Sequence, residues 1–215
     1  MKPMTVAFLA LAMLAGTSHA WAAAREIPTA AECGKLANPV GPFDYRKHRS
    51  GSAILANVEG NHFGPDVENL VRGQSSYLAG DIEYVLRAFP NHHRALLSLS
   101  RLSQKAKSER LQGLHWPVTC MFVRAVEFAP DDPVVRGIYA VHLSNRGNRR
   151  EAIEQIDAAI KYGADDANTL YNAGLVYLDV GDYDKALEYA KKAYAAGYPL
   201  PGLRNKLKAG GHWRE

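Results

Sequence analysis

A pattern that returns every 34 residues constrains the C-terminal half of this chain more than any other feature. Small residues recur at that step: Ala140 returns as Gly174, Gly147 as Gly181, Ala152 as Ala186, and Ala159 as Ala193. A fixed period of this length is typical of a helix-turn-helix unit that stacks on copies of itself to bury its apolar face. Gly and Ala suit the positions where two helices cross closely, because a larger side chain would push them apart. The pattern predicts an all-α fold.

The last copy, residues 167–198, carries a recognisable motif. Its motif residues are Leu170, Gly174 and Tyr177, then the turn Gly181-Asp182-Tyr183, then Ala186, Ala190 and Ala193. The copy before it, residues 133–164, keeps Ala140, Leu143, Gly147, Ala152, Ile156 and Ala159. Both copies resemble the tetratricopeptide repeat (TPR) family, with Leu170 in place of the first-helix Trp. The resemblance implies TPR-type helix pairs stacked as a short right-handed superhelix.

Five segments follow along the chain. Residues 1–24 are a signal peptide, 25–61 an irregular N-terminal arm, 62–132 divergent TPR-like helical pairs, 133–198 two clear repeats, and 199–215 a capping helix and tail. The divergent pairs are predicted at 67–72 with 75–89, and at 93–103 with 116–129, the latter separated by a polar insertion at 105–115. A terminal repeat has no neighbour for its last apolar face. We therefore expect Leu203 and Leu207 of the cap to face inward.

The first 24 residues have the pattern of a signal peptide for export. Lys2 gives a positive start, residues 6–15 are a short apolar run, and small residues offer cleavage after Ala20 or Ala24. The run is too short to be a good membrane span, although a retained anchor is the alternative. The prediction is a periplasmic or secreted protein with no integral membrane segment after cleavage.

Export would place the two cysteines, Cys33 and Cys120, in an oxidising compartment. In an oxidising compartment two thiols are more often paired than free. No Cys-x-x-Cys motif is present, so a structural disulfide is favoured over a redox pair, with two free thiols as the alternative. Such a bridge would fasten the arm to the stack.

The N-terminal arm is expected to pack on the stack, because Phe43 and Tyr45 lie beside Pro and Gly. The alternative is a disordered leader. Residues 53–58 are open between a short strand and a helical turn.

Several functional classes find no support. The formal net charge of +4 is too mild for nucleic-acid binding, which needs a concentrated basic stripe. The histidines lack the i, i+3 or i+4 pairing typical of helical metal ligands, and no nucleotide or nucleophile motif occurs. The sequence therefore predicts no metal, no cofactor, no catalytic residue and no enzyme.

The TPR resemblance also implies where a partner lies, because ligands of the family usually follow the concave face built by the first helices. The residues at those motif positions are Asn168, Tyr171, Asn172, Leu175, Leu178 and Asp179 in the last copy, and Val134, Ile138, Val141, Ser144 and Asn145 in the preceding one. Gly137 and Tyr171 stand where carboxylate-clamping members carry Lys or Arg, which favours apolar and amide contacts with weak salt dependence. The alternative is that these residues only pack or face solvent.

Two functions from different classes follow. The first is an exported scaffold that binds a peptide or a partner subunit of a cell-envelope assembly. The alternative is an envelope enzyme or ligand-binding protein with a site around His62, His92 and His93, together with Arg94. The alternative needs those side chains to share one pocket, which the structure can test.

Overall fold

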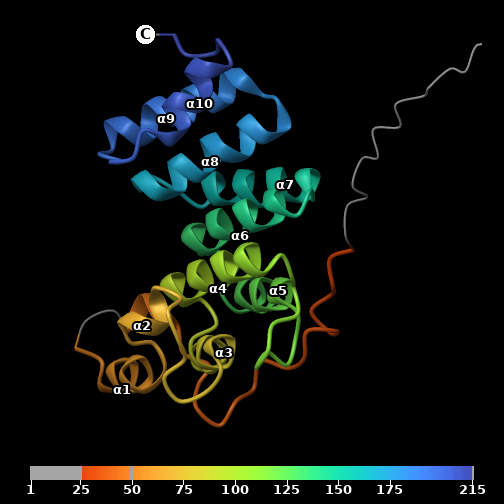
Figure 1. The fold of residues 1–215 in the computed structure, drawn as a ribbon, viewed down its shortest axis with the longest axis vertical. Coiled ribbons are helices and arrows are strands. Elements are labelled where there is room, and N and C mark those ends of the chain that lie inside the picture. Colours follow the sequence, from red (N-terminus) through yellow and green to blue (C-terminus); the bar gives the residue numbers. More distant parts are fainter. Residues whose placement is uncertain (1–25, 49–50, 215) are drawn as a thin grey trace, which may run out of the picture.

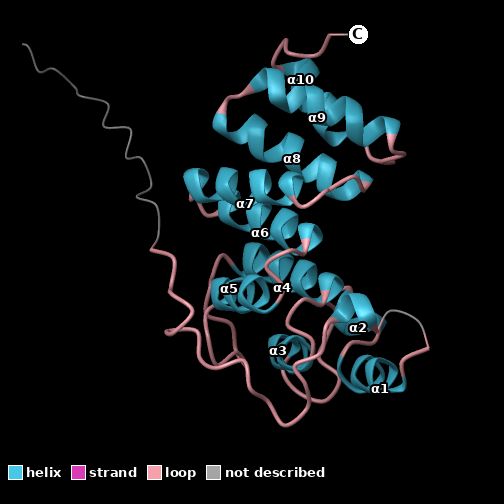
Figure 2. Ribbon diagram, turned by 180° about the vertical axis from the view of Figure 1, so that it is seen from behind, coloured by secondary structure: helices cyan, strands magenta, loops and turns pink. Residues whose placement is uncertain are grey.

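The computed structural model describes residues 26–48 and 51–214, and the predicted signal peptide with both cleavage sites lies outside this part of the chain. Within it the chain forms ten α-helices and one 3₁₀ helix, with no strand, as Figure 2 shows. The elements are η1 (Tyr45–Lys47), α1 (Ala53–His62), α2 (Pro65–Glu68), α3 (Leu78–Ala88), α4 (His93–Ala106), α5 (Val118–Phe128), α6 (Pro133–Asn145), α7 (Arg149–Lys161), α8 (Ala167–Val180), α9 (Tyr183–Ala195) and α10 (Gly202–Ala209). The predicted all-α class is confirmed.

The helices form a stack that rises from α1 and α3 to α10 (Figure 1). Helix α6 pairs with α7 and α8 with α9, while α6 also packs on α4 below it and on α8 above it. The first helices of successive pairs, α4, α6 and α8, therefore lie in contact as one layer. The two repeats expected over 133–198 are these two helix pairs.

Local sequence explains where the repeat helices begin and end. Asp132 and Asp166 are N-caps, and their carboxylates accept hydrogen bonds from backbone amides of the first turns of α6 and α8. Such a cap satisfies amides that have no partner within the helix. Gly181 ends α8 with a φ of 84°, a left-handed conformation that glycine adopts without a Cβ penalty. The 34-residue spacing thus reflects repeated starts and stops.

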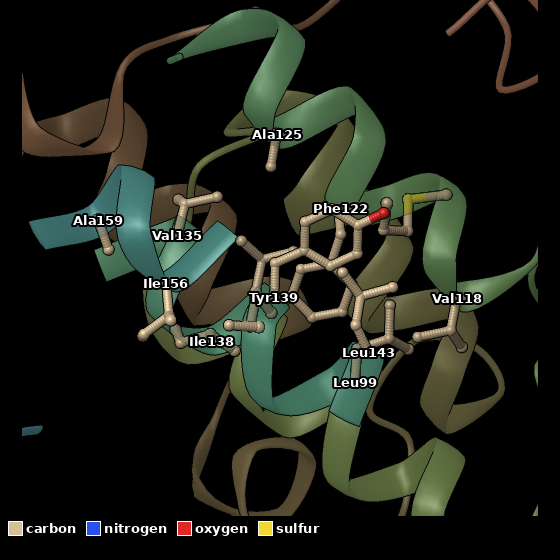
Figure 3. Packing of buried hydrophobic residues seen from close by; sticks show 14 of the residues in the cluster. Leu99, Val118, Phe122, Ala125, Val135, Ile138, Tyr139, Leu143, Ile156 and Ala159 are labelled. Carbon is tan, nitrogen blue, oxygen red and sulfur yellow. The ribbon is translucent and has the colours of Figure 1, made fainter. Parts of the chain in front are cut away.

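The core runs through the whole stack, and its middle layer is shown in Figure 3. The rings of Phe122 in α5 and Tyr139 in α6 are stacked, with centroids 5.1 Å apart and planes 5° apart. The small residues of the second helices (Ala152, Ala159, Ala186, Ala190 and Ala193) are all fully buried. A methyl side chain is what lets the second helix approach the first so closely.

The close contact between α8 and α9 gives a direct test of the repeat alignment. A Cβ added to Gly174 would lie 3.3 Å from the backbone oxygen of Ala186, so little free space separates the helices. Ala186→Leu is expected to overpack this contact and lower the free energy of unfolding by about 1–3 kcal/mol. Ala195→Leu, at an exposed position of the same helix, is the control. An unchanged urea midpoint for Ala186→Leu would contradict the alignment.

The structure corrects the sequence-based assignment of the first helices. Residues 53–58 belong to α1, which extends to His62 and packs on α3, so the expected boundary at 61 falls inside a helix. The helix predicted over 67–72 is wrong, because α2 ends at Glu68. The backbone amides of residues 74–76 all donate to the Asp81 carboxylate. This side chain takes the place of helical partners and delays the start of α3 to Leu78.

The described part of the arm is packed, as expected. Phe43 donates its backbone amide to Ala88 O at 2.8 Å, and its ring lies 5.5 Å from that of Phe89. The backbone amide of Tyr45 donates to Asn91 Oδ1 at 2.9 Å. In Figure 1 the arm follows the stack beside α5 and then passes beneath α3.

The predicted disulfide between Cys33 and Cys120 is present, with both cysteines buried. Next to it, the Arg124 guanidinium donates to the carbonyl oxygens of residues 33, 34 and 35 at 2.8–3.0 Å. A covalent bond and three hydrogen bonds thus hold one stretch of arm on one helix, α5.

The C-terminal cap also matches its prediction. Leu203 and Leu207 of α10 are fully buried against α8 and α9. Among residues 26–48 and 51–214, none of the helices has the length and apolar character needed to cross a membrane.

Candidate partner-binding face

The residues predicted to bind a partner differ in exposure. Asn145, Asn168 and Asp179 are exposed; Val134, Val141, Ser144, Asn172, Leu175 and Leu178 are partly buried; Ile138 and Tyr171 are buried. The first two groups come from α6 and α8, which pack side by side. They give this face a mixture of amide, hydroxyl and apolar contacts that a partner can reach.

Tyr171 has a structural role that its motif position did not reveal. Only 9% of the residue is exposed, and its ring stacks on Tyr198 with centroids 3.8 Å apart. Its hydroxyl accepts a hydrogen bond from the backbone amide of Leu203 at 3.0 Å. Tyr171 therefore fixes the start of the capping helix, and its neighbour Asn172 is the better candidate for partner contact.

A cavity of about 620 Å³ lies at one edge of this face, where α4 and α6 end. Three predicted residues, Ser144, Asn145 and Asp179, line it. Ser144 Oγ donates to Asp179 Oδ2 at 2.7 Å, so neighbouring repeats are linked across the cavity. The insertion between α4 and α5 supplies another wall, through Lys107 and its two successors.

A polar cluster forms the buried side of the cavity around Glu109. The Glu109 carboxylate accepts hydrogen bonds from Ser103 Oγ at 3.0 Å and from Thr119 N and Oγ1 at 2.8 and 2.7 Å. His142 Nε2 lies 3.3 Å and Arg146 Nη1 3.6 Å from the same carboxylate. Burial raises the pKa of Glu109, but the contacts with His142, Thr119 and Arg146 outweigh it and lower the pKa to about 2.

This shift predicts an acid-sensitive contribution to stability. A depressed carboxyl pKa stabilises the fold above the unfolded-state pKa of about 4.5 and loses that effect as the pH falls towards 2. Glu109→Gln is expected to cost about 1–3 kcal/mol at neutral pH, because buried donors lose a charged acceptor. It should also flatten the fall in stability between pH 4.5 and 2. Urea unfolding at several pH values checks both effects; parallel curves for the two proteins would contradict the assignment.

Within residues 26–48 and 51–214, the three histidines of the alternative hypothesis do not line one of the main cavities together. His62 Nδ1 lies 2.9 Å from Asp81 Oδ1 and lines a small cavity that neither His92 nor His93 borders. His92 is fully buried; its Nδ1 accepts from the backbone amide of Ala95, so its Nε2 carries the proton and donates to Glu59 at 2.8 Å. Burial lowers the pKa of His92, although its contact with Glu59 acts in the opposite direction.

The other two members of that group are also held by carboxylates. His93 Nε2 lies 2.9 Å from Asp132 Oδ2, and Arg94 pairs with Glu59 and Glu68. These contacts join α4 to the helices on either side of it. No group of three or more potential metal ligands occurs in the part of the chain that the structure describes. Of this group, His92 and Arg94 meet at Glu59, whereas His62 and His93 contact other carboxylates.

Sequence reasoning missed the contribution of the insertion to the cavity. Lys107 and Glu109 have no counterpart in the 34-residue pattern, because they lie between α4 and α5, where the spacing departs from the repeat. The run of polar residues at 105–110 was the available signal. The backbone oxygen of Glu109 accepts from Val118 N, so this loop also caps the start of α5.

Comparison with known proteins supports the repeat assignment. The sequence model of the family described as "Tetratricopeptide repeat" matches residues 140–199, which include α7, α8 and α9. No curated protein and no solved structure matches the chain. The match and the stacked helix pairs together identify residues 140–199 as tetratricopeptide repeat structure.

Proposed function

We propose that the protein is an exported scaffold that holds a peptide or a partner subunit of a cell-envelope assembly along the face of α6 and α8. Tetratricopeptide repeats point to protein–protein interaction and are generally non-catalytic. The observation that carries the proposal is the exposure pattern of the first helices. Val134, Val141, Leu175 and Leu178 stay partly exposed on α6 and α8. The alanines of α7 and α9 that recur with the 34-residue period are fully buried.

The chemistry of this face favours a segment that brings both apolar side chains and backbone polar groups. The Asn172 amide makes no side-chain hydrogen bond with any residue of 26–48 or 51–214. It can therefore donate to and accept from a partner backbone. Leu175, one turn further along α8, offers the adjacent apolar contact. The weak salt dependence expected from Gly137 and Tyr171 stays a prediction for these apolar and amide contacts of α6 and α8.

The proposed location is the periplasm or the extracellular space. The disulfide supports it, because such bonds persist in oxidising compartments and are rare in the cytosol. The signal-like first 24 residues point the same way. Fractionation of cells that express the tagged full chain tests the location, and recovery of the reduced, uncleaved protein in the cytosol would contradict it.

The function is tested by capture and then by affinity. The tagged chain without residues 1–24 is cross-linked in the envelope fraction of its own cells, and bound chains are identified by mass spectrometry. The affinity of the captured partner is then measured for Asn172→Ala and for Asn172→Ala with Leu175→Ala. We expect at least about a tenfold loss for the double variant, since each contact contributes about 1 kcal/mol.

Matched controls use residues outside the face. Asn205→Ala, at an exposed position of α10, controls for loss of an amide. Tyr171→Ala is unsuitable as a binding test because Tyr171 holds the cap through Tyr198 and Leu203. Unchanged affinity of the folded double variant would exclude this face and direct attention to the N-terminal arm.

A further inference from the structure

The cavity where α4 and α6 end offers unused hydrogen-bond donors. The side chains of Gln104, Lys107 and Asn145 line it, and none of them makes a hydrogen bond or ion pair with another residue of the described chain. Lys107 is held in place by its backbone, which adopts a left-handed φ of 51° and closes α4 through its amide. Three donor groups from two helix ends therefore face one space.

The carboxylates of the same cavity are already occupied. Glu109 accepts from Ser103 and from Thr119, and it lies 3.3 Å from His142 Nε2. Asp179 accepts from Ser144 at 2.7 Å and pairs with Arg149 at 3.4 Å. The Gln104 and Asn145 amides can still donate or accept, whereas the Lys107 ammonium can only donate, so the free charged group of the cavity calls for an acceptor.

The charged side chains that line the cavity also favour an anionic group as its ligand. Lys107, Arg146 and Arg149 line the cavity together with only two carboxylates. Those carboxylates lie beside Arg146 and Arg149, at 3.6 and 3.4 Å, and no carboxylate within residues 26–48 or 51–214 pairs with Lys107. The carbonyl ends of α4 and α6 oppose an anion, but this effect is weaker than a charged hydrogen bond. Amides of residues 107, 108, 147 and 148 already satisfy carbonyls of these ends.

We propose that this cavity binds a carboxylate of the partner segment, with Lys107 as its counter-charge and the Gln104 and Asn145 amides as further donors. The inference rests on the proposed scaffold function and adds a charged anchor point at the edge of the partner-binding face. A volume of about 620 Å³ admits a whole acidic side chain or a chain-terminal residue. Either source presents the same carboxylate, and the experiment separates them.

The test uses three blocked amino acids as probes of the chain without residues 1–24. N-acetylglutamate α-amide carries a side-chain carboxylate, N-acetylglutamine a terminal one, and N-acetylglutamine α-amide none. Amide chemical shifts are followed by NMR during titration. We expect one of the two acids to bind at least about tenfold more tightly than the neutral probe and to shift residues 104–109 and 144–147. Equal binding of all three, or shifts confined to other residues, would overturn the inference.

The variant Lys107→Asn removes the charge and keeps a residue that tolerates the left-handed conformation. We expect the preferred acid to bind at least about tenfold more weakly to this variant, with no change for Lys161→Asn, an exposed control on α7. Unchanged binding to Lys107→Asn would overturn the inference. If the captured partner binds wild type and Lys107→Asn equally, the carboxylate anchor fails while the scaffold stands. If the acid probe binds here but no partner uses the α6–α8 face, the scaffold fails while the anchor stands.

Discussion

Removal of the disulfide through Cys33→Ala with Cys120→Ala is expected to lower the free energy of unfolding by about 4 kcal/mol. The two cysteines are 87 residues apart, so the bridge strongly restricts the unfolded chain, and the chain-entropy model gives about this value. Alanine is chosen because both sites are buried and serine would place a hydroxyl there. Urea unfolding of the two proteins measures the difference.

The reductant provides the control for this prediction. Wild type in excess dithiothreitol should unfold at the midpoint of the double variant, and the double variant should not respond to the reductant. Mass spectrometry of the non-reduced wild type should show a linked peptide pair. Complete alkylation of both thiols without reductant, or equal midpoints for the two oxidised proteins, would contradict the structural role of the bridge.

Phe122→Ala is expected to cost about 3–5 kcal/mol, the range for truncating a fully buried aromatic side chain. Phe122 stacks on Tyr139 and on His142, so it joins α5 to α6 at the place where the divergent and the clear repeats meet (Figure 3). Its loss leaves a cavity between two rigid helices that cannot both move in.

Phe128→Ala, at the partly exposed end of the same helix, is the matched control and should cost about 1–2 kcal/mol. Calorimetry of both variants gives the comparison, with helix content checked by circular dichroism. Similar losses for the two variants would show that the α5–α6 junction does not hold the two parts of the stack together.

The sequence predicted the clear repeats well because their signal is local and periodic. Caps such as Asp132 and Asp166 and small residues such as Ala186 act within one helix pair, so spacing alone reveals them. The first helices were less predictable. The segment before α3 is non-helical because the Asp81 carboxylate binds its amides, and this contact depends on how the chain returns on itself.

The candidate partner-binding face shows the same contrast between what the repeat pattern predicts and what it does not. Motif positions located Asn172, Leu175 and Ser144 on accessible parts of α6 and α8, because the resemblance fixes the register of each helix. They misjudged Tyr171, whose environment is created by Tyr198 and Leu203 beyond the repeat. The cavity residues Lys107 and Glu109 belong to an insertion, for which the repeat pattern supplies no expectation.

The two ends of the stack are held by different interactions, so we expect local unfolding to begin at one end and not at the other. At the lower end the arm is tied to α5 by a covalent bond and to the α3–α4 junction by backbone hydrogen bonds. At the upper end α10 is held without a covalent bond, by two buried leucines, by the hydroxyls of Tyr171 and Tyr194 and by the Arg204 guanidinium over the Tyr194 ring. In a linear array each repeat contacts only its neighbours, so local unfolding begins at the less stable terminus and spreads inward. Amide hydrogens of α10 and α9 should therefore exchange with solvent first, and those of α5 last.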